Sequence, residues 1–329
     1  MNRRQALLLA LGAGLAGNAA LLRAQAPAGP VRRIGVLVPG KPAREDVILK
    51  PFYDGMRELG WIEGRNAIYD RVYAEEDFSR LPALAAELAA RKPDAIYAPP
   101  TAAALAAKKA TRTIPIVFGS AREVVANGLV ESLARPGGNV TGVTTIGNEL
   151  GLKRLQLLRE ILPDVRRVGM LFDNSELSAR LEKQSAEETR GKLGLAIVFA
   201  NASLAEQIEP AVKSLVKNRV EALYATNSTM FFHQRKQMIA LCRDFRLPVF
   251  GSLKEYAEDG ALASYGSNLD EQLRRSAYLM DKVLKGVQPA DIPVEQPTKY
   301  ELVINVGAAK ALGLKIPPAL LQRADRVIE

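Results

Sequence analysis

Short β-branched runs alternate with longer amphipathic segments from residue 33 almost to the end of the chain. The first run, 33–38, is followed by a segment in which Ile48, Phe52, Met56 and Leu59 share one helical face. The same pattern predicts further strands at 67–73, 94–98, 114–118, 140–145, 167–172, 196–200, 222–225, 248–250 and 262–265. Helices such as 81–91 and 151–162, with apolar residues at spacings of three and four, are predicted between them.

Strands and helices in this order are typical of parallel sheets that are covered by helices on both faces. Nine or ten such units are too many for one ordinary doubly wound sheet, so the predicted fold class is α/β with two doubly wound lobes. Turn residues are densest at 134–139, which marks a break. We expect the chain to cross between the lobes at 140–145, at 263–268 and near 299–305, which makes both lobes discontinuous in sequence.

Residues 1–26 have the features of an export signal. Arg3 and Arg4 precede an apolar run from Ala6 to Leu22, and Ala24-Gln25-Ala26 forms a small-x-small cleavage site. The paired arginines fit a twin-arginine signal, and an ordinary secretory signal is the alternative. The segment near the predicted cleavage site has no cysteine, so a lipid anchor is not expected. The sequence therefore predicts a soluble periplasmic protein.

Much of the positive charge belongs to this predicted signal. The whole chain has a formal net charge of +9, and removal of Arg3, Arg4 and Arg23 leaves 42 Lys and Arg against 36 Asp and Glu, or about +6. The remaining charges are dispersed and form no basic run with interleaved aromatic residues. Nucleic-acid binding is therefore not expected.

The single cysteine, Cys242, cannot form an intramolecular disulfide. Its neighbours, Met238-Ile239-Ala240-Leu241, place it on a predicted amphipathic helix, so we expect a buried, unreactive thiol. About 300 residues remain after the predicted signal, and a chain of that length can bury two cores without covalent cross-links.

A series of sequence blocks points to a known family. The blocks follow one another along nearly the whole chain after residue 26, and they are 33–37 (RIGVL), 59–66 (LGWIEGRN), 81–88 (LPALAAEL), 114–118 (IPIVF), 128–142 (GLVESLARPGGNVTG), 247–251 (LPVFG), 293–305 (PVEQPTKYELVIN) and 309–318 (AKALGLKIPP). In this order they resemble the ABC-transporter substrate-binding proteins of the tryptophan/aromatic-amino-acid-type group.

The resemblance implies a periplasmic-binding-protein type I fold, in which two similar lobes joined by three hinge crossings close on a small molecule. We expect the N-terminal lobe to comprise 31–145 and 271–297, and the C-terminal lobe to comprise 146–270 and 298–329. One segment departs from the family pattern. Relatives usually carry Asp-Pro-Val after the strand at 114–118, and this chain has Gly119-Ser-Ala-Arg-Glu-Val124 there. That loop faces the cleft in the implied fold. The identity of the ligand is therefore the part of the resemblance that transfers least well to this chain.

Ligands of parallel α/β sheets bind beyond the carboxyl ends of the strands, where the amino termini of helices converge. In this chain, the residues that this rule selects as ligand-binding candidates are Thr101, Ala102, Ser120, Ala121, Asn174, Asn227, Ser252 and Tyr265.

Thr101 is the sharpest local signal, because it follows a predicted strand as the cap of a helix that begins with small residues. Such a helix start suits a ligand carboxylate, and a threonine that only caps its own helix is the alternative. The resemblance supports the first interpretation, because relatives place a small or hydroxyl residue at this position.

Other candidates could complete such a site. Ser120 could add a hydroxyl to the same anion, and Gly119 could let a ligand approach the backbone closely. Arg122 is a rival partner for an anion, although an exposed surface arginine is the commoner outcome. Asn174 and Asn227 could orient an amine, amide or hydroxyl, or could serve only as helix caps. The carboxylates of Asp173, Glu255 and Asp270 could balance an ammonium group, or could simply be solvated.

Sequence motifs for catalysis are missing. His233 is the single histidine and has no partner for a metal site or a hydrolase triad, and no phosphate-binding glycine motif follows a strand. We therefore expect no catalytic residues, no metal and no cofactor, and we do not expect an enzyme.

The favoured function is a periplasmic receptor that captures a small carboxylate-bearing solute, an amino acid or aromatic compound, and delivers it to an ABC permease in the inner membrane. A receptor that feeds a sensor instead of a permease is the alternative, and an exported α/β enzyme is a third, disfavoured one. Partners are thus a small-molecule ligand and a permease, and we expect a monomer.

Overall fold

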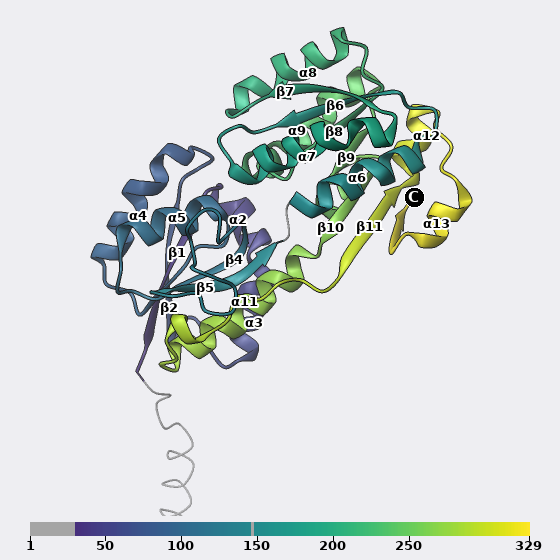
Figure 1. Ribbon diagram of the computed structural model, residues 1–329. Helices are drawn as coiled ribbons and strands as arrows, with labels where there is room; N and C mark the ends of the chain where they lie inside the picture. Colours follow the sequence, from purple (N-terminus) through teal and green to yellow (C-terminus); the bar gives the residue numbers. More distant parts are fainter. Residues whose placement is uncertain (1–29, 146–147) are drawn as a thin grey trace, which may run out of the picture.

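The computed structural model describes residues 30–145 and 148–329, so the predicted export signal at 1–26 lies outside the described residues. The described chain forms two α/β lobes, each built on its own sheet, as the sequence predicts (Figure 1). The first lobe contains the early strands and the second contains the later ones. The predicted α/β fold class is therefore confirmed.

The first sheet has five strands, and all of its described pairings are parallel. Their spatial order is β2 (Ala67–Tyr73), β1 (Arg32–Val38), β3 (Ala95–Tyr97), β4 (Ile116–Arg122) and β5 (Val140–Thr145). Its helices are α2 (Pro42–Ile48), α3 (Lys50–Glu58), α4 (Leu81–Ala90), α5 (Thr101–Ala110) and α11 (Leu269–Leu284), with the short turns η1 (Phe78–Arg80) and η3 (Pro289–Asp291).

Helices cover both faces of this sheet. Ile34 and Val36 of β1 pack in the cluster that contains Phe52 of α3 and Leu273 of α11. Leu37 packs on the opposite face, in the cluster that contains residues of α4 and α5. This is the alternation expected for a strand buried on both sides.

The second sheet has seven strands. Their order is β12 (Arg326–Ile328), β11 (Tyr300–Asn305), β10 (Ala263–Ser267), β9 (Val249–Gly251), β8 (Ala222–Ala225), β6 (Arg167–Phe172) and β7 (Ala196–Asn201). The pairing of β10 with β11 is antiparallel and the other described pairings are parallel. The expectation of purely parallel sheets was wrong at this pair, because β11 returns from the first lobe and enters the sheet in the opposite direction.

Two groups of helices cover the second sheet. Its helices are α6 (Asn148–Ile161), α7 (Leu177–Leu193), α8 (Ile208–Lys217), α9 (Thr229–Asp244), α10 (Lys254–Glu258), α12 (Val306–Leu312) and α13 (Pro318–Arg323), with η2 (Ala205–Gln207). Leu155 of α6 and Ala186 of α7 pack with Met170 of β6. Val212 of α8 and Met238 of α9 pack on the opposite face, in the cluster that contains Leu171 of β6.

The chain passes between the lobes three times, as the fold prediction requires. The passages lie between β5 and α6, between β10 and α11, and between η3 and β11 (Figure 1). Segment 140–145, which we expected to be a crossing, is a strand of the first sheet, and the crossing follows it. The returning chain also lies beside β5, where Thr144 N–H donates to the carbonyl of Glu295 at 2.8 Å.

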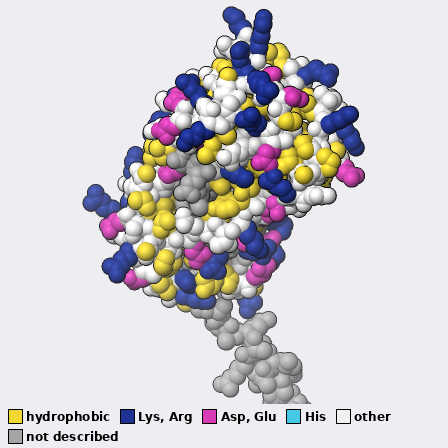
Figure 2. All heavy atoms as spheres, turned by 45° about the vertical axis from the view of Figure 1, so that its right-hand side comes forward, with side chains coloured by type: hydrophobic (Ala, Val, Ile, Leu, Met, Phe, Trp, Pro, Cys, Tyr) yellow, Lys and Arg dark blue, Asp and Glu magenta, His cyan; other side chains and the backbone are white. Residues whose placement is uncertain are grey.

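Charged side chains are distributed over the face shown in Figure 2, where Lys and Arg are interspersed with Asp and Glu on both lobes. This matches the dispersed charge of the sequence. In the part of the chain that the structure describes, no helix combines the length and apolar character needed to span a membrane.

Candidate ligand-binding site

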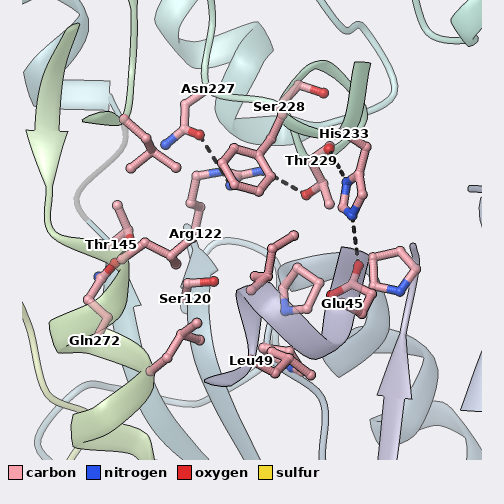
Figure 3. Close-up of a pocket in the computed structure, with 18 residues that line it drawn as sticks. Glu45, Leu49, Ser120, Arg122, Thr145, Asn227, Ser228, Thr229, His233 and Gln272 are labelled. Carbon is pink, nitrogen blue, oxygen red and sulfur yellow. Dashed lines mark hydrogen bonds and ion pairs between the residues drawn. The ribbon is translucent and has the colours of Figure 1, made fainter. Parts of the chain in front are cut away.

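A small cavity lies between the lobes, and we call it the inner cavity. The first lobe lines it with Ser120, Arg122 and Thr145 among others, and the second lobe with Asn227, Thr229 and His233 among others (Figure 3). Its volume is about 60 Å³. Several lining side chains are apolar, including Leu49, Phe232, Leu253, Leu269 and Leu273. The two lobes thus enclose a mixed apolar and polar space at the carboxyl ends of their strands, where the sequence predicted a site.

A bulge at the end of β4 places two polar residues in this cavity. The pairing of β4 with β5 shifts register between Phe118 and Ala121. Unbroken alternation would place these two residues on opposite faces, but both pack in the same cluster under α5. Ser120 and Arg122 line the inner cavity instead. Glu123, which follows, has a left-handed backbone with φ of 50°, a conformation that is costly for a non-glycine residue.

Arg122 reaches from the first lobe to the second. Its guanidinium donates to Ser178 Oγ at 3.3 Å, Thr229 Oγ1 at 3.2 Å and Asn227 Oδ1 at 3.5 Å, and it forms an ion pair with Glu176. All four partners belong to the second lobe. Arg122 is only 6% exposed, so the expectation that it is an exposed surface arginine was wrong. A guanidinium can be buried here because each of these partners compensates part of its charge.

Glu176 occupies the amino terminus of α9. Its Oε1 accepts from the backbone N–H of Thr229 at 2.8 Å and from Ser228 Oγ at 3.3 Å. The amino terminus of a 16-residue helix carries partial positive charge, which stabilises a carboxylate. Arg122 and the start of α9 therefore form a site for an anion, and the protein's own Glu176 occupies it.

A larger cavity of about 480 Å³ lies on the other side of this ion pair, and we call it the outer cavity. Phe78, Thr101 and Ala102 of the first lobe line it, as do Glu176 and Ser178 of the second lobe. Arg122 lines the inner cavity, and two of its partners line the outer one. The Arg122–Glu176 pair therefore separates the two cavities.

Other polar contacts join the lobes beside the inner cavity. His233 Nε2 lies 2.8 Å from Glu45 Oε1, and both side chains are at most 5% exposed. His233 Nδ1 lies 2.8 Å from the carbonyl oxygen of Thr229. Glu45 Oε1 also accepts from Gly40 N–H at 2.9 Å. Together, histidine and carboxylate bridge the cleft between α2 and α9.

Glu76 reinforces the same closed arrangement. Its carboxylate pairs with Arg44 of its own lobe at 3.1 Å and accepts from Gln234 of the second lobe at 3.1 Å. Arg44 also donates to the backbone carbonyl of His233. These three contacts add to the Glu45–His233 bridge.

A buried ion pair supports the second-lobe wall from behind. Arg154 and Glu182 are 1% and 2% exposed and lie 3.0 Å apart, and Tyr224 donates to Glu182. Burial raises the pKa of Tyr224 well above its ordinary value, so the phenol keeps its proton. Glu182 Oε2 accepts from Asn227 N–H at 3.2 Å, and Arg154 Nε donates to the carbonyl of Tyr265 at 2.7 Å. This pair thereby fixes the loop that carries Asn227.

The structure separates the predicted site residues into three groups. Ser120 and Asn227 line the inner cavity, and Thr101 and Ala102 line the outer one. Ala121 is buried under α5, and Ser252 is buried behind β10, where its carbonyl approaches Gly266. Tyr265 packs on Tyr300 near the hinge, and Asn174 is exposed and hydrogen-bonded to Asn201. The last four lie outside both cavities as the described residues define them.

Two local expectations need correction. Thr101 is not the cap of α5, because that position belongs to Pro100. Its Oγ1 instead accepts from the backbone N–H of Arg122 at 2.8 Å, so it holds the end of β4 in place. Gly119 does not make room for a ligand, because a Cβ there would lie 2.4 Å from Tyr97 Oη and 2.9 Å from Leu273 Cδ2. It makes room for α11.

Comparisons with known proteins agree with this architecture. The family model for ABC transporter substrate binding proteins matches residues 33–328. The chain belongs to the ABC transporter substrate-binding protein family. In the described part of this family member, no group of three or more His, Cys, Asp and Glu side chains is placed to hold a metal ion.

Named relatives in this family bind aromatic amino acids. A tyrosine-binding protein of Clostridioides difficile is 28% identical over 271 residues, which cover 82% of this chain and 77% of the relative. A domain from Streptococcus pneumoniae, solved in complex with L-Trp, is 26% identical with a TM-score of 0.83, and the match covers 91% of this chain and all of that one.

A third relative allows the lobe arrangement to be compared. The ligand-free, open structure of a substrate-binding protein from C. difficile is 25% identical, and the match covers 91% of this chain and 99% of that one. Its TM-score is 0.65, against 0.83 for the L-Trp complex at nearly the same identity. This chain is therefore more similar to the ligand-bound relative than to the open one, in agreement with the polar contacts across its cleft.

Sequence reasoning missed Glu45, Glu176 and Glu182. Glu176 stands only two residues after Asn174, in a loop that was already a candidate, but its carboxylate resembled any solvated acid. Glu182 lies in α7 and Glu45 in α2, and they form contacts with residues 42 and 188 positions away. One local signal was available for Glu176, because an acid that follows a strand and precedes a helix lies at the ligand-binding edge.

Proposed function

We propose that this chain is the periplasmic receptor of an ABC importer, and that it captures an amino acid with an aromatic side chain and delivers it to a membrane permease. The observation that carries the proposal is a cleft whose two walls come from different lobes and which encloses one arginine, several hydroxyl and amide groups, and apolar side chains. Such a lining buries an apolar body and orients a charged end.

The mechanism follows from the contacts between the lobes. A ligand that touches both walls stabilises the closed form, because its contacts with the second wall are lost when the lobes part. The closed surface is then the shape that a permease would recognise. The names of the relatives support an aromatic amino acid as the ligand.

A thermal-shift screen with L-Tyr, L-Trp, L-Phe and a broad set of other amino acids, aromatic acids and metabolites tests the receptor function. A ligand at 100 times its Kd should stabilise the protein by about 2.7 kcal/mol. Small-angle scattering should show a smaller radius of gyration with the same ligand. A screen with no thermal shift and no compaction would contradict the proposal, and a deletion strain with unchanged uptake of the ligand would contradict the transport role.

A further inference from the structure

The Arg122–Glu176 pair is an unusual feature of a binding cleft, because two opposite charges from different lobes meet inside it. Arg122 is 8% and Glu176 19% exposed at their side chains. A buried ion pair contributes little to folding stability compared with well-packed apolar residues. This pair also breaks whenever the lobes separate, so it cannot hold either lobe together by itself.

A ligand that uses the apolar and polar residues of the inner cavity must part this pair, as the volumes of the two cavities indicate. The inner cavity, at about 60 Å³, has room for a few water molecules and is far below the roughly 300 Å³ at which ligand pockets begin. The outer cavity is about 480 Å³, which suits a ligand. A molecule that reaches the apolar residues of the inner cavity from the outer one has to pass between Arg122 and Glu176.

Charge balance then selects the class of molecule. A simple carboxylic acid could replace Glu176 at Arg122, but it would leave the Glu176 carboxylate without its counter-charge. A simple amine could bind Glu176, but it would leave the guanidinium unpaired. An uncompensated charge at a buried site is strongly unfavourable. A molecule with both charges on one end compensates both residues.

We propose that Arg122 and Glu176 are the specificity-determining residues of this receptor, and that they exchange their mutual ion pair for the carboxylate and the ammonium group of one zwitterionic α-amino acid. Arg122 binds the carboxylate and Glu176 binds the ammonium group. This inference rests on the proposed receptor function and assigns the two residues that recognise the charged end of its amino-acid ligand.

The test compares three ligands with the same side chain. L-Tyr or L-Trp, whichever binds the wild-type protein more tightly, is titrated calorimetrically beside its decarboxylated amine and its deaminated acid. Wild-type protein should bind both analogues about 100-fold more weakly than the amino acid, or worse. Arg122→Gln should reduce the preference over the amine to less than about tenfold, and Glu176→Gln should do the same for the preference over the acid.

Matched controls separate this effect from general damage. Glu188→Gln removes an exposed carboxylate of α7, and Arg180→Gln removes an exposed arginine of the same helix; neither residue lines either cavity. Both should keep the wild-type preference. Thermal unfolding of each variant without ligand establishes that it is folded.

The outcomes distinguish this inference from the receptor function. If wild-type protein binds the amino acid and its deaminated acid equally well, or if Arg122→Gln keeps the full preference over the amine, the inference fails and the receptor function stands. A ligand released from purified protein that lacks either charge has the same consequence. If no small molecule binds at all, both fail.

Discussion

Glu255 lies in the first turn of α10 with its side chain partly exposed, and its Oε2 has no hydrogen-bond partner among the described residues. Burial raises the pKa of this carboxyl from 4.5 to about 7, and nearby Lys254 opposes the shift. Between pH 4.5 and 7, the Glu255 carboxyl therefore keeps its proton in the folded protein and loses it in the unfolded chain. Stability falls as pH rises through that range, because charging the carboxyl costs more in the fold.

Glu255→Gln removes this titration. We expect the free energy of unfolding of the variant to depend less on pH between 4.5 and 7, and to exceed that of the wild type at pH 7 by on the order of 1–3 kcal/mol. Urea unfolding at several pH values measures it. Glu258→Gln, at an exposed position of the same helix, is the control. Parallel pH profiles for wild type and Glu255→Gln would contradict the prediction.

Arg122 shows what a single residue can and cannot reveal in sequence. An arginine after a strand is most often solvated, and local sequence gives no reason for another outcome. Its partners Glu176, Ser178, Asn227 and Thr229 are 54 to 107 positions away. Cys242 is different, since its apolar neighbours predicted burial and the structure confirms it at 0% exposure.

At the scale of elements, the fit of α11 against β4 depends on Gly119. Tyr97 Oη and Ser276 Oγ are hydrogen-bonded at 2.8 Å directly beside this glycine. Helix α11 belongs to the late part of the chain and yet covers the first sheet, where it also contacts α3 at Gly55. Close contact at these two glycines lets α11 complete the first lobe next to the hinge.

Gly119→Ala should destabilise the protein by about 1–3 kcal/mol, because the new methyl group overlaps Tyr97 and Leu273. Thermal or chemical unfolding measures the change. Gly191→Ala in α7 is a matched control, since its added Cβ has no heavy atom within 4 Å apart from its chain neighbours and the nearby backbone of its own helix. It should stabilise by roughly 0.5–1 kcal/mol through helix propensity. Equal stability of Gly119→Ala and the wild type would rule out the tight packing described here.

Sequence periodicity predicted most strands within a few residues, because a strand buried on both faces needs an almost continuous apolar run. It did not predict β12, and it gave a crossing between the lobes near 299–305 where the structure has the antiparallel strand β11. Strand β12 is three residues long and largely exposed, so its composition carries little signal. The bulge in β4 was missed for a related reason, since it is a property of the β4–β5 register and leaves no pattern in β4 alone.

At the scale of the whole molecule, polar side chains join the two lobes across the cleft. The Glu45–His233 bridge lies inside the closed cleft, and opening would expose both groups to water. Phe78 of the first lobe and Phe232 of the second both make edge contacts with the ring of His233. The bridge therefore favours the closed form by hydrogen bonding and by packing.

His233→Phe keeps an aromatic ring but leaves Glu45 buried without its partner in the closed form. We expect the variant to shift toward the open form by about 1–3 kcal/mol, because opening returns the carboxylate to water. Small-angle scattering without ligand should give a larger radius of gyration than the wild type. Glu58→Gln, which breaks an ion pair with Arg274 within the first lobe, should not change it. A His233→Phe variant as compact as the wild type would contradict this role.

The sequence by itself determined the two-lobed α/β fold, the family and the edge of each sheet at which a ligand can bind. These follow from periodicity and from ordered blocks, which are local properties of the chain. Only the tertiary structure decided which side chains meet in the cleft, because Arg122 with Glu176, and Glu45 with His233, come from different lobes. Burial gives these charges their roles, and burial arises only when the lobes close on each other.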